Sequence, residues 1–93
     1  MEGKMKIWAL LRKKQAIFLD VVSEFSYEEE ADWPYVIGEL AVKLQQSRPV
    51  ILSKHLFELR QFQRTTFFPG DFLEPVSFDR MEIEIFKEEK RKR

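Results

Sequence analysis

The sequence is poor in residue types that carry chemistry, with no cysteine, one histidine and three glycines among 93 residues. The absence of cysteine excludes disulfides, thiolate catalysis and cysteine-based zinc sites. A single histidine also leaves no second imidazole for a histidine-based metal cluster. We therefore expect no metal and no cofactor.

Long apolar runs are lacking as well. No stretch approaches the roughly 20 residues that a membrane-spanning helix requires. The N-terminal segment IWALL is too short for a signal peptide and runs directly into the basic residues RKK. The sequence thus predicts a soluble cytoplasmic protein that does not bind membranes.

Net charge is zero, because 16 basic residues balance 16 acidic ones. Domains that bind nucleic acid are usually strongly basic, so the balance argues against attraction of the whole protein to nucleic acid. The charges are nevertheless segregated, with acidic residues concentrated at 24–39 and 71–86 and basic residues elsewhere.

What is present is an ordinary folding composition, 44% hydrophobic and 14% aromatic. The length suits one small domain with a single core. We expect this domain at 1–86 and a disordered charged tail at 87–93.

Residues 5–25 fit two secondary structures. A helix would align Ile7, Leu10 and Leu11 in a stripe that Lys14 interrupts. Two strands would instead make RKKQ a hairpin turn and put Ile17, Leu19 and Val21 on one face of the second strand. We favour the hairpin because branched and aromatic residues flank the polar turn, although the turn lacks glycine and asparagine.

A helix is predicted from about 33 to 46. Pro34 suits the first helical position, which places any turn at 27–31 outside this helix. The apolar residues recur with helical spacing at Trp33, Val36, Ile37, Leu40 and Leu44.

A second helix is predicted at 53–63, after a short extended run at 50–52. Ser53 is a suitable N-cap, and Leu56, Leu59 and Phe62 would form the buried stripe. The poor helix formers Thr65-Thr66 mark its end, and Pro69-Gly70 suits a type II turn.

The last predicted element is a strand within 74–86. Met81, Ile83 and Ile85 alternate with two glutamates, whereas Val76 and Phe78 have the opposite phase. A bend near Asp79-Arg80 would reconcile the two phases. The sequence therefore predicts an α+β fold, a three-stranded antiparallel sheet with two helices on one face.

Residues 48–84 resemble a group of short uncharacterised bacterial proteins. The shared pattern comprises Arg48-Pro49, Leu52-Ser53-Lys54-His55, Phe62, Thr65-x-Phe67, Phe72-x-Glu74, Val76, Phe78-Asp79 and Met81 through Glu84. The opening MKIWALLRKK also looks like the first strand of such proteins, but Gln15-Ala16 stands where they have a glycine-containing turn. The group has no established activity, so the resemblance implies a bacterial origin and a fold rather than a function.

The first candidate site is the start of the second helix. Ser53, Lys54 and His55 lie where free backbone N–H groups would favour an anion, with Lys54 adding charge and Arg60 and Arg64 extending the site. We favour the simpler interpretation of an N-capping Ser53 followed by two exposed polar residues.

Catalysis has little support in the sequence. Glu58 lies three residues after His55, a spacing common on helix surfaces. No nucleophile motif is present, and the acidic clusters lack the spacing of calcium loops. We expect no enzymatic activity and no small-molecule substrate.

Nucleic-acid binding is the alternative function. The basic residues of the predicted hairpin, the second helix and the tail, mixed with Phe57, Phe67 and Phe68, could contact phosphates and bases. The basic residues of the hairpin and the tail are Lys4, Lys6, Arg12, Lys13, Lys14, Lys90, Arg91, Lys92 and Arg93, and those of the second helix are the Lys54, Arg60 and Arg64 named above.

We predict a protein-interaction module that binds a protein partner or itself. Phe67, Phe68 and Phe72 flank the Pro-Gly turn and would either close the core, the interpretation that we favour, or form an apolar contact surface. An exposed sheet edge would offer a second route, by strand addition or dimerisation. The candidate binding surface comprises Lys54, His55, Arg60, Arg64, Phe67, Phe68 and Phe72.

Overall fold

The computed structural model describes residues 4–26 and 32–87. The elements in chain order are β1 (Lys4–Lys13), β2 (Ala16–Ser26), α1 (Trp33–Lys43), α2 (Ser53–Phe62), β3 (Arg64–Phe67), the short 3-10 turn η2 (Pro69–Asp71) and β4 (Arg80–Lys87). The expected tail at 87–93 lies outside the described residues except for Lys87, which ends β4, and the expected turn at 27–31 lies outside them as well.

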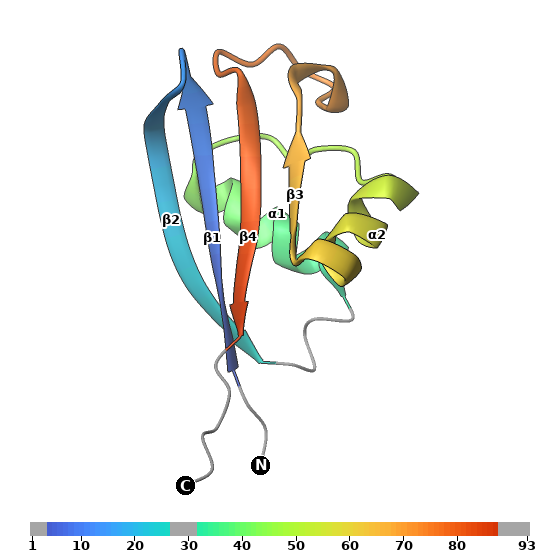
Figure 1. Cartoon of the computed structure of the whole chain (residues 1–93). Coiled ribbons are helices and arrows are strands. Elements are labelled where there is room, and N and C mark those ends of the chain that lie inside the picture. The colour runs from blue at the N-terminus through green and yellow to red at the C-terminus, as the bar shows by residue number, and fades with distance from the viewer. Residues whose placement is uncertain (1–3, 27–31, 88–93) are drawn as a thin grey trace, which may run out of the picture.

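The fold is α+β, and its antiparallel sheet has four strands in the order β2-β1-β4-β3. The prediction of three strands was wrong because β3 follows directly after α2. Its four residues include two β-branched threonines and a phenylalanine, which suit a strand and pair with β4. Figure 1 shows α1 crossing one face of the sheet and α2 lying beyond β3.

The hairpin between β1 and β2 is confirmed. Lys14 and Gln15 form a two-residue turn in which both have positive φ, 55° and 69°. Two positive φ values define the type I′ turn that matches the twist of a hairpin. The turn therefore forms without the expected glycine, although a left-handed conformation costs an ordinary residue about 1–2 kcal/mol.

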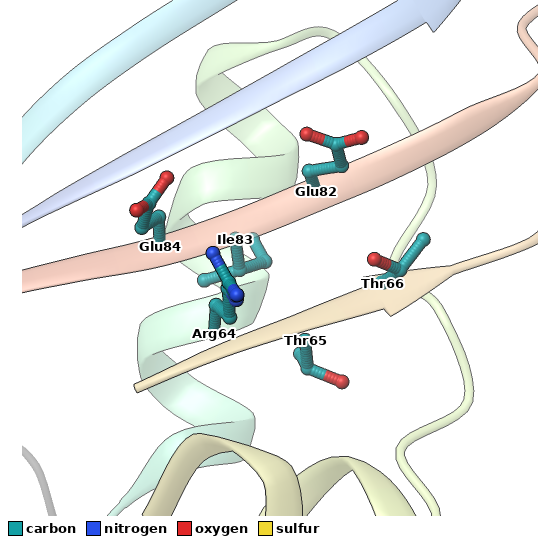
Figure 2. Close-up of a pocket in the computed structure, with 6 residues that line it drawn as sticks. All are labelled: Arg64, Thr65, Thr66, Glu82, Ile83 and Glu84. Atoms are coloured by element: carbon teal, nitrogen blue, oxygen red, sulfur yellow. The ribbon is translucent and has the colours of Figure 1, made fainter. Parts of the chain in front are cut away.

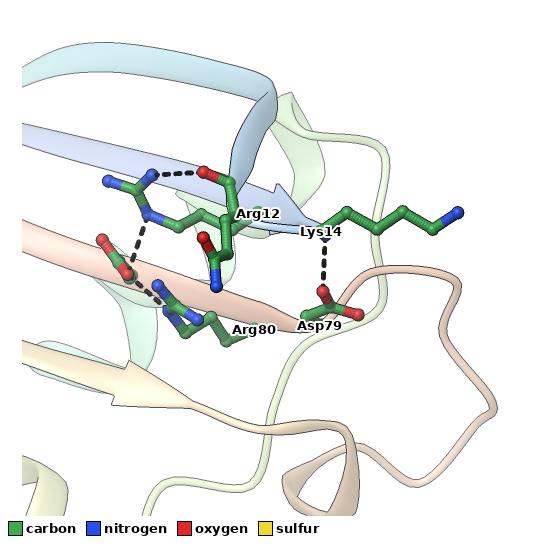
Figure 3. Close-up of polar contacts among 6 residues, drawn as sticks. Arg12, Lys14, Asp79 and Arg80 are labelled. Carbon is green, nitrogen blue, oxygen red and sulfur yellow. Dashed lines mark hydrogen bonds and ion pairs between the residues drawn. The ribbon is translucent and has the colours of Figure 1, made fainter.

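Polar contacts hold the turn against the residues that precede β4 (Figure 3). The backbone N–H of Lys14 donates to Oδ2 of Asp79 at 2.6 Å. The N–H of Asp79 donates in turn to the carbonyl of Arg12 at 2.7 Å. Nearby, Nε of Arg12 and Nε of Arg80 lie 3.0 and 2.6 Å from the same oxygen of Glu82. These contacts compensate for part of the strain in the turn.

A β-bulge changes which side chains share a face of β2. Leu11 pairs with Leu19, whereas Arg12 pairs with Ile17, so Phe18 is the extra residue. Ile17 therefore faces the opposite side from Leu19 and Val21. The prediction that all three share a face was wrong because it assumed an uninterrupted period of two.

Helix α1 follows its predicted pattern. All five residues of its predicted stripe are buried, and Asp32 accepts a hydrogen bond from the N–H of Tyr35 at the helix start. The helix ends at Lys43 rather than 46, and Gln45 has a left-handed φ of 62°. Gly38 permits close packing, because a Cβ there would lie 2.7 Å from the Arg48 guanidinium.

The start of α2 differs from the prediction. Leu52 is the N-cap, so Ser53 lies inside the helix. Leu59 is buried as expected, but Phe62 is 61% exposed. The Pro-Gly type II turn is also wrong, because residues 69–71 form a 3-10 turn and Gly70 has no positive φ.

The core lies between the helices and the inward face of the sheet. Met81, Ile83 and Ile85 of β4 point into it as predicted, and β4 begins at Arg80, where the bend was expected. Phe78 is buried from the preceding loop, in edge-to-face contact with Phe72 at 5.3 Å. The opposite face of the sheet carries no helix in the described part of the chain (Figure 1).

Candidate functional site

The predicted site at the start of α2 contains a buried histidine. His55 is 0% exposed, and its ring lies 4.2 Å from the ring of Phe67. The N–H of Leu52 donates to Nδ1 of His55 at 2.9 Å, and the N–H of His55 donates to the carbonyl of Leu52 at 3.0 Å. His55 therefore caps its own helix by a reciprocal pair of hydrogen bonds.

The accepted hydrogen bond assigns the tautomer of His55. Because Nδ1 accepts, the proton of the neutral ring lies on Nε2. Nε2 is buried without a hydrogen-bond partner and lies 3.7 Å from Oδ2 of Asp71, too far for a hydrogen bond. Burial lowers the pKa of His55 from its ordinary value, and the nearby carboxylate of Asp71 opposes this only in part.

These contacts make His55 a structural residue rather than part of an exposed anion site. The interpretation of His55 as an exposed polar residue was wrong, because its ring fills space between α2 and Phe67. A neutral, buried imidazole adds no positive charge to the helix start. Lys54, to which the prediction gave the added charge, is exposed beside it.

The three phenylalanines around residues 67–72 are divided between core and surface. Phe67 is 0% and Phe72 7% exposed, whereas Phe68 is 51% exposed. Phe67 and Phe72 therefore cannot belong to a contact surface, because both side chains close the core. Of the seven residues proposed as one surface, Lys54, Arg60, Arg64 and Phe68 are exposed.

Arg64 belongs to a different surface from the residues of α2. It starts β3 on the uncovered face of the sheet and is the register partner of Glu84 on β4. Figure 2 shows Arg64 on β3 beside β4, which carries Glu82 and Glu84, and these residues line a hollow of about 230 Å³. The charges of both signs on this face give it no net preference for an anion.

The basic hairpin residues are mostly engaged with the protein itself. Arg12 contacts Glu82, and Nζ of Lys13 lies 5.6 Å from the ring centre of Phe18. Lys13 and Lys14 are exposed at the turn. Lys90, Arg91, Lys92 and Arg93 of the predicted nucleic-acid surface lie outside the described residues.

In the part of the chain that the structure describes, the outer edge of the sheet at β2 pairs with no further strand. This strand is 11 residues long and lies at one end of the strand order. It exposes large apolar side chains along its length, at Ile17, Phe18, Leu19 and Val22, each at least 40% exposed. The sequence shows these residues, but only the strand order shows that they lie at an edge.

The uncovered face beside β2 carries further apolar groups. Trp8 is the register partner of Val22, and its indole N–H donates to Oδ2 of Asp20 at 2.9 Å. Leu10 lies in the same face and is 1% exposed, although it is not part of the main core. This hydrogen bond links the outer face of β1 to the outer face of β2.

The described residues offer little to catalysis or to metals. At 4–26 and 32–87, no group of three or more histidine, cysteine, aspartate or glutamate side chains is arranged to hold a metal ion. No helix in the same ranges is long and apolar enough to cross a membrane.

Comparison with protein-family models, with curated proteins and with solved structures finds no match to this chain. The resemblance of residues 48–84 to a bacterial group therefore stays a prediction.

Proposed function

We propose that this chain is a small non-enzymatic protein-interaction module of the bacterial cytoplasm, and that it binds its partner at the free edge of β2. The observation that carries the proposal is the character of this edge. Over 11 residues it has four exposed large apolar side chains and no lysine, arginine or proline. Lysine and proline are residue types that proteins commonly use to protect an edge strand, and the charged residues of β2 are the two carboxylates Asp20 and Glu24.

Strand addition would use both the backbone and the side chains of β2. The outer N–H and C=O groups of an edge strand are free to continue the ladder, and alternate side chains supply specificity. Ile17 and Val22 lie on the uncovered face of the sheet, whereas Leu19 lies on the helix face. An added strand would therefore cover apolar groups on both faces.

This proposal moves the contact surface away from α2. Of the residues predicted to form the surface there, Lys54, Arg60 and Phe68 are exposed, whereas His55, Phe67 and Phe72 are buried. Nucleic-acid binding remains the alternative, and the exposed lysines of the turn support it. The acidic residues Asp20, Glu82 and Glu84 on the uncovered face of the sheet oppose it, because they would repel phosphates.

Site-specific photo-cross-linking tests the proposal. A photoreactive amino acid in place of Phe18 lies on the β2 edge, and one in place of Phe57 lies on α2, on the other side of the sheet (Figure 1). The two positions are matched in exposure, at 50% and 56%. We expect protein adducts from position 18 and background from position 57. Equal yields, or adducts that contain nucleic acid, would contradict the proposal.

A further inference from the structure

We infer that the strand added to β2 is the β2 strand of a second copy of this chain, in a symmetric antiparallel dimer centred on Val21. This inference rests on the proposed function, because it names the partner of the same edge. The dimer would join two four-stranded sheets into one continuous sheet. Its support is the order of charged and apolar residues along β2.

Symmetry limits the registers that two β2 strands can adopt. A two-fold dimer pairs each residue with its counterpart across the axis, so a central residue pairs with itself. Side chains that pair in an antiparallel ladder lie on the same face of the sheet, and successive side chains alternate between faces. The two-fold axis must therefore pass midway between the two copies of one residue, which pairs with itself. Each possible register is named after that central residue.

Centring the dimer on Val21 produces no pair of like charges. Val21 meets Val21 of the second copy, Asp20 meets Val22, and Leu19 meets Ser23. Beyond these, Glu24 lies opposite Phe18, the bulged residue. Both carboxylates of β2 thus face apolar side chains, and the exposed Leu19 and Phe18 are covered.

The adjacent registers bring carboxylates together. Centring on Asp20 places the two Asp20 side chains directly opposite one another. Centring on Val22 places Asp20 opposite Glu24 twice. Like charges directly opposite in a sheet are destabilising, so both registers are disfavoured.

The registers two steps away cover less of the apolar edge. A dimer centred on Ser23 avoids like charges but leaves Ile17, Phe18 and Leu19 beyond the paired residues of β2. One centred on Leu19 overlaps only at the bulged end of the strand. The Val21 register pairs Phe18 through Glu24 without opposing carboxylates, and it includes more of the exposed apolar edge than either alternative. Beyond the bulge the ladder ends, because Ile17 and Phe25 lie on opposite faces of the sheet.

Single cysteine substitutions give a direct test, because the natural sequence contains no cysteine. Paired residues in an antiparallel ladder have Cα atoms about 4.5–5.5 Å apart, within disulfide range. Across Leu19→Cys, Asp20→Cys, Val21→Cys, Val22→Cys and Ser23→Cys, we expect the disulfide-linked dimer to form fastest for Val21→Cys. Mixing Asp20→Cys with Val22→Cys should give the mixed disulfide. A maximum at position 23 would overturn the proposed register.

A pair of substitutions at Val22 tests the same register without oxidation. Val22 is 57% exposed, so both variants should fold. In the Val21 register, Val22→Asp adds two carboxylate pairs with Asp20 and should weaken self-association about tenfold. Val22→Lys forms opposite-charge pairs there and should retain it. Equal weakening by both would contradict the register, since the loss of apolar surface alone would then explain the result.

Sedimentation of the wild-type chain decides whether the second copy is the partner. We expect a species of twice the 11.2 kDa chain mass. A chain that stays monomeric at millimolar concentration overturns the dimer. If photo-cross-linking at position 18 then yields adducts with a different protein, the proposed function stands without the dimer. If it yields none, both proposals fail.

Discussion

The two outer strands of the sheet, β3 and β2, differ in length, in their contact with a helix and in the exposure of their side chains. β3 is four residues long and follows directly from α2, which packs beside it. Its Thr65 is buried and donates to Oε1 of Glu58 on that helix at 2.6 Å. β2 is 11 residues long and has exposed apolar side chains along its length.

β3 is short, lies beside α2 and begins with the charged residue Arg64. These are features by which proteins protect the edges of sheets. The long edge at β2 has, among the described residues, its bulge at Phe18 and the carboxylates of Asp20 and Glu24 as protective features, but neither shortness nor lysine nor proline. The contrast supports the proposal that β2, and not β3, is the edge that pairs with a partner.

Removing the phenylalanine that anchors the protected edge should cause the largest loss of stability. Phe67 is 0% exposed and contacts the His55 ring, so Phe67→Ala should lower the free energy of unfolding by about 3–5 kcal/mol. Urea denaturation followed by tryptophan fluorescence measures this loss. Phe68→Ala is the matched control, because the adjacent ring is 51% exposed and should matter much less. Similar losses in the two variants would show that the β3 edge is not held by Phe67.

Lowering the pH should reduce the free energy of unfolding through His55, whose ring packs against Phe67 of β3. Burial lowers the pKa of His55 in the folded protein below the value of 6.5 expected when unfolded. The unfolded chain therefore binds the proton more readily, and the free energy of unfolding falls as the pH drops below 6.5 toward the folded pKa. The steepest slope for one such group is about 1.4 kcal/mol per pH unit. Above pH 6.5, stability should not depend on this group.

The groups that face His55 set the size of this effect. Asp71 on η2 and Glu58 on α2 favour the charged ring, whereas Lys54 opposes it. Urea titrations at one chain concentration, from about pH 8 to about pH 5, would measure the slope. His55→Gln removes the only imidazole in the sequence and should abolish this component. An unchanged pH dependence in that variant would rule out His55 as its source.

The elements that sequence predicted well are those whose signal is periodic. Helix α1 shows five apolar residues at helical spacing, and β4 alternates isoleucines with glutamates, so each pattern identifies its own buried face. β3 has only four residues and no turn before it, and its pairing depends on β4 rather than on a local signal. The bulge at Phe18 likewise depends on the partner strand.

The candidate site was harder to predict because it depends on burial and strand order. His55 lies at the third position after Leu52, where a side chain can reach back to the capping N–H, and the choice of Ser53 as the cap concealed this. The apolar residues of β2 are visible in the sequence, but a strand at an edge and a strand in the middle have similar patterns. An exposed edge could therefore be anticipated, but not which strand would form it.

The smallest predicted effect comes from substitutions in the turn before β2, which should change the stability of the fold without changing how the β2 edge pairs. Lys14 and Gln15 hold positive φ values in the type I′ turn before β2. Asparagine followed by glycine is the preferred sequence for such a turn. The double substitution Lys14→Asn and Gln15→Gly should therefore raise the free energy of unfolding by about 1 kcal/mol. The backbone contact from position 14 to Asp79 is retained, because it uses the N–H rather than the side chain.

Thermal unfolding measures this gain, and Gln15→Ala is the control because alanine does not relieve the strain at positive φ. The substituted residues lie outside Leu19–Ser23, so the self-association constant should stay unchanged while the melting temperature rises. A change in self-association would mean that the turn, and not only the β2 edge, contacts the second copy. An unchanged constant with higher stability would show that β2 can be strengthened as part of the sheet while its outer edge remains available for pairing.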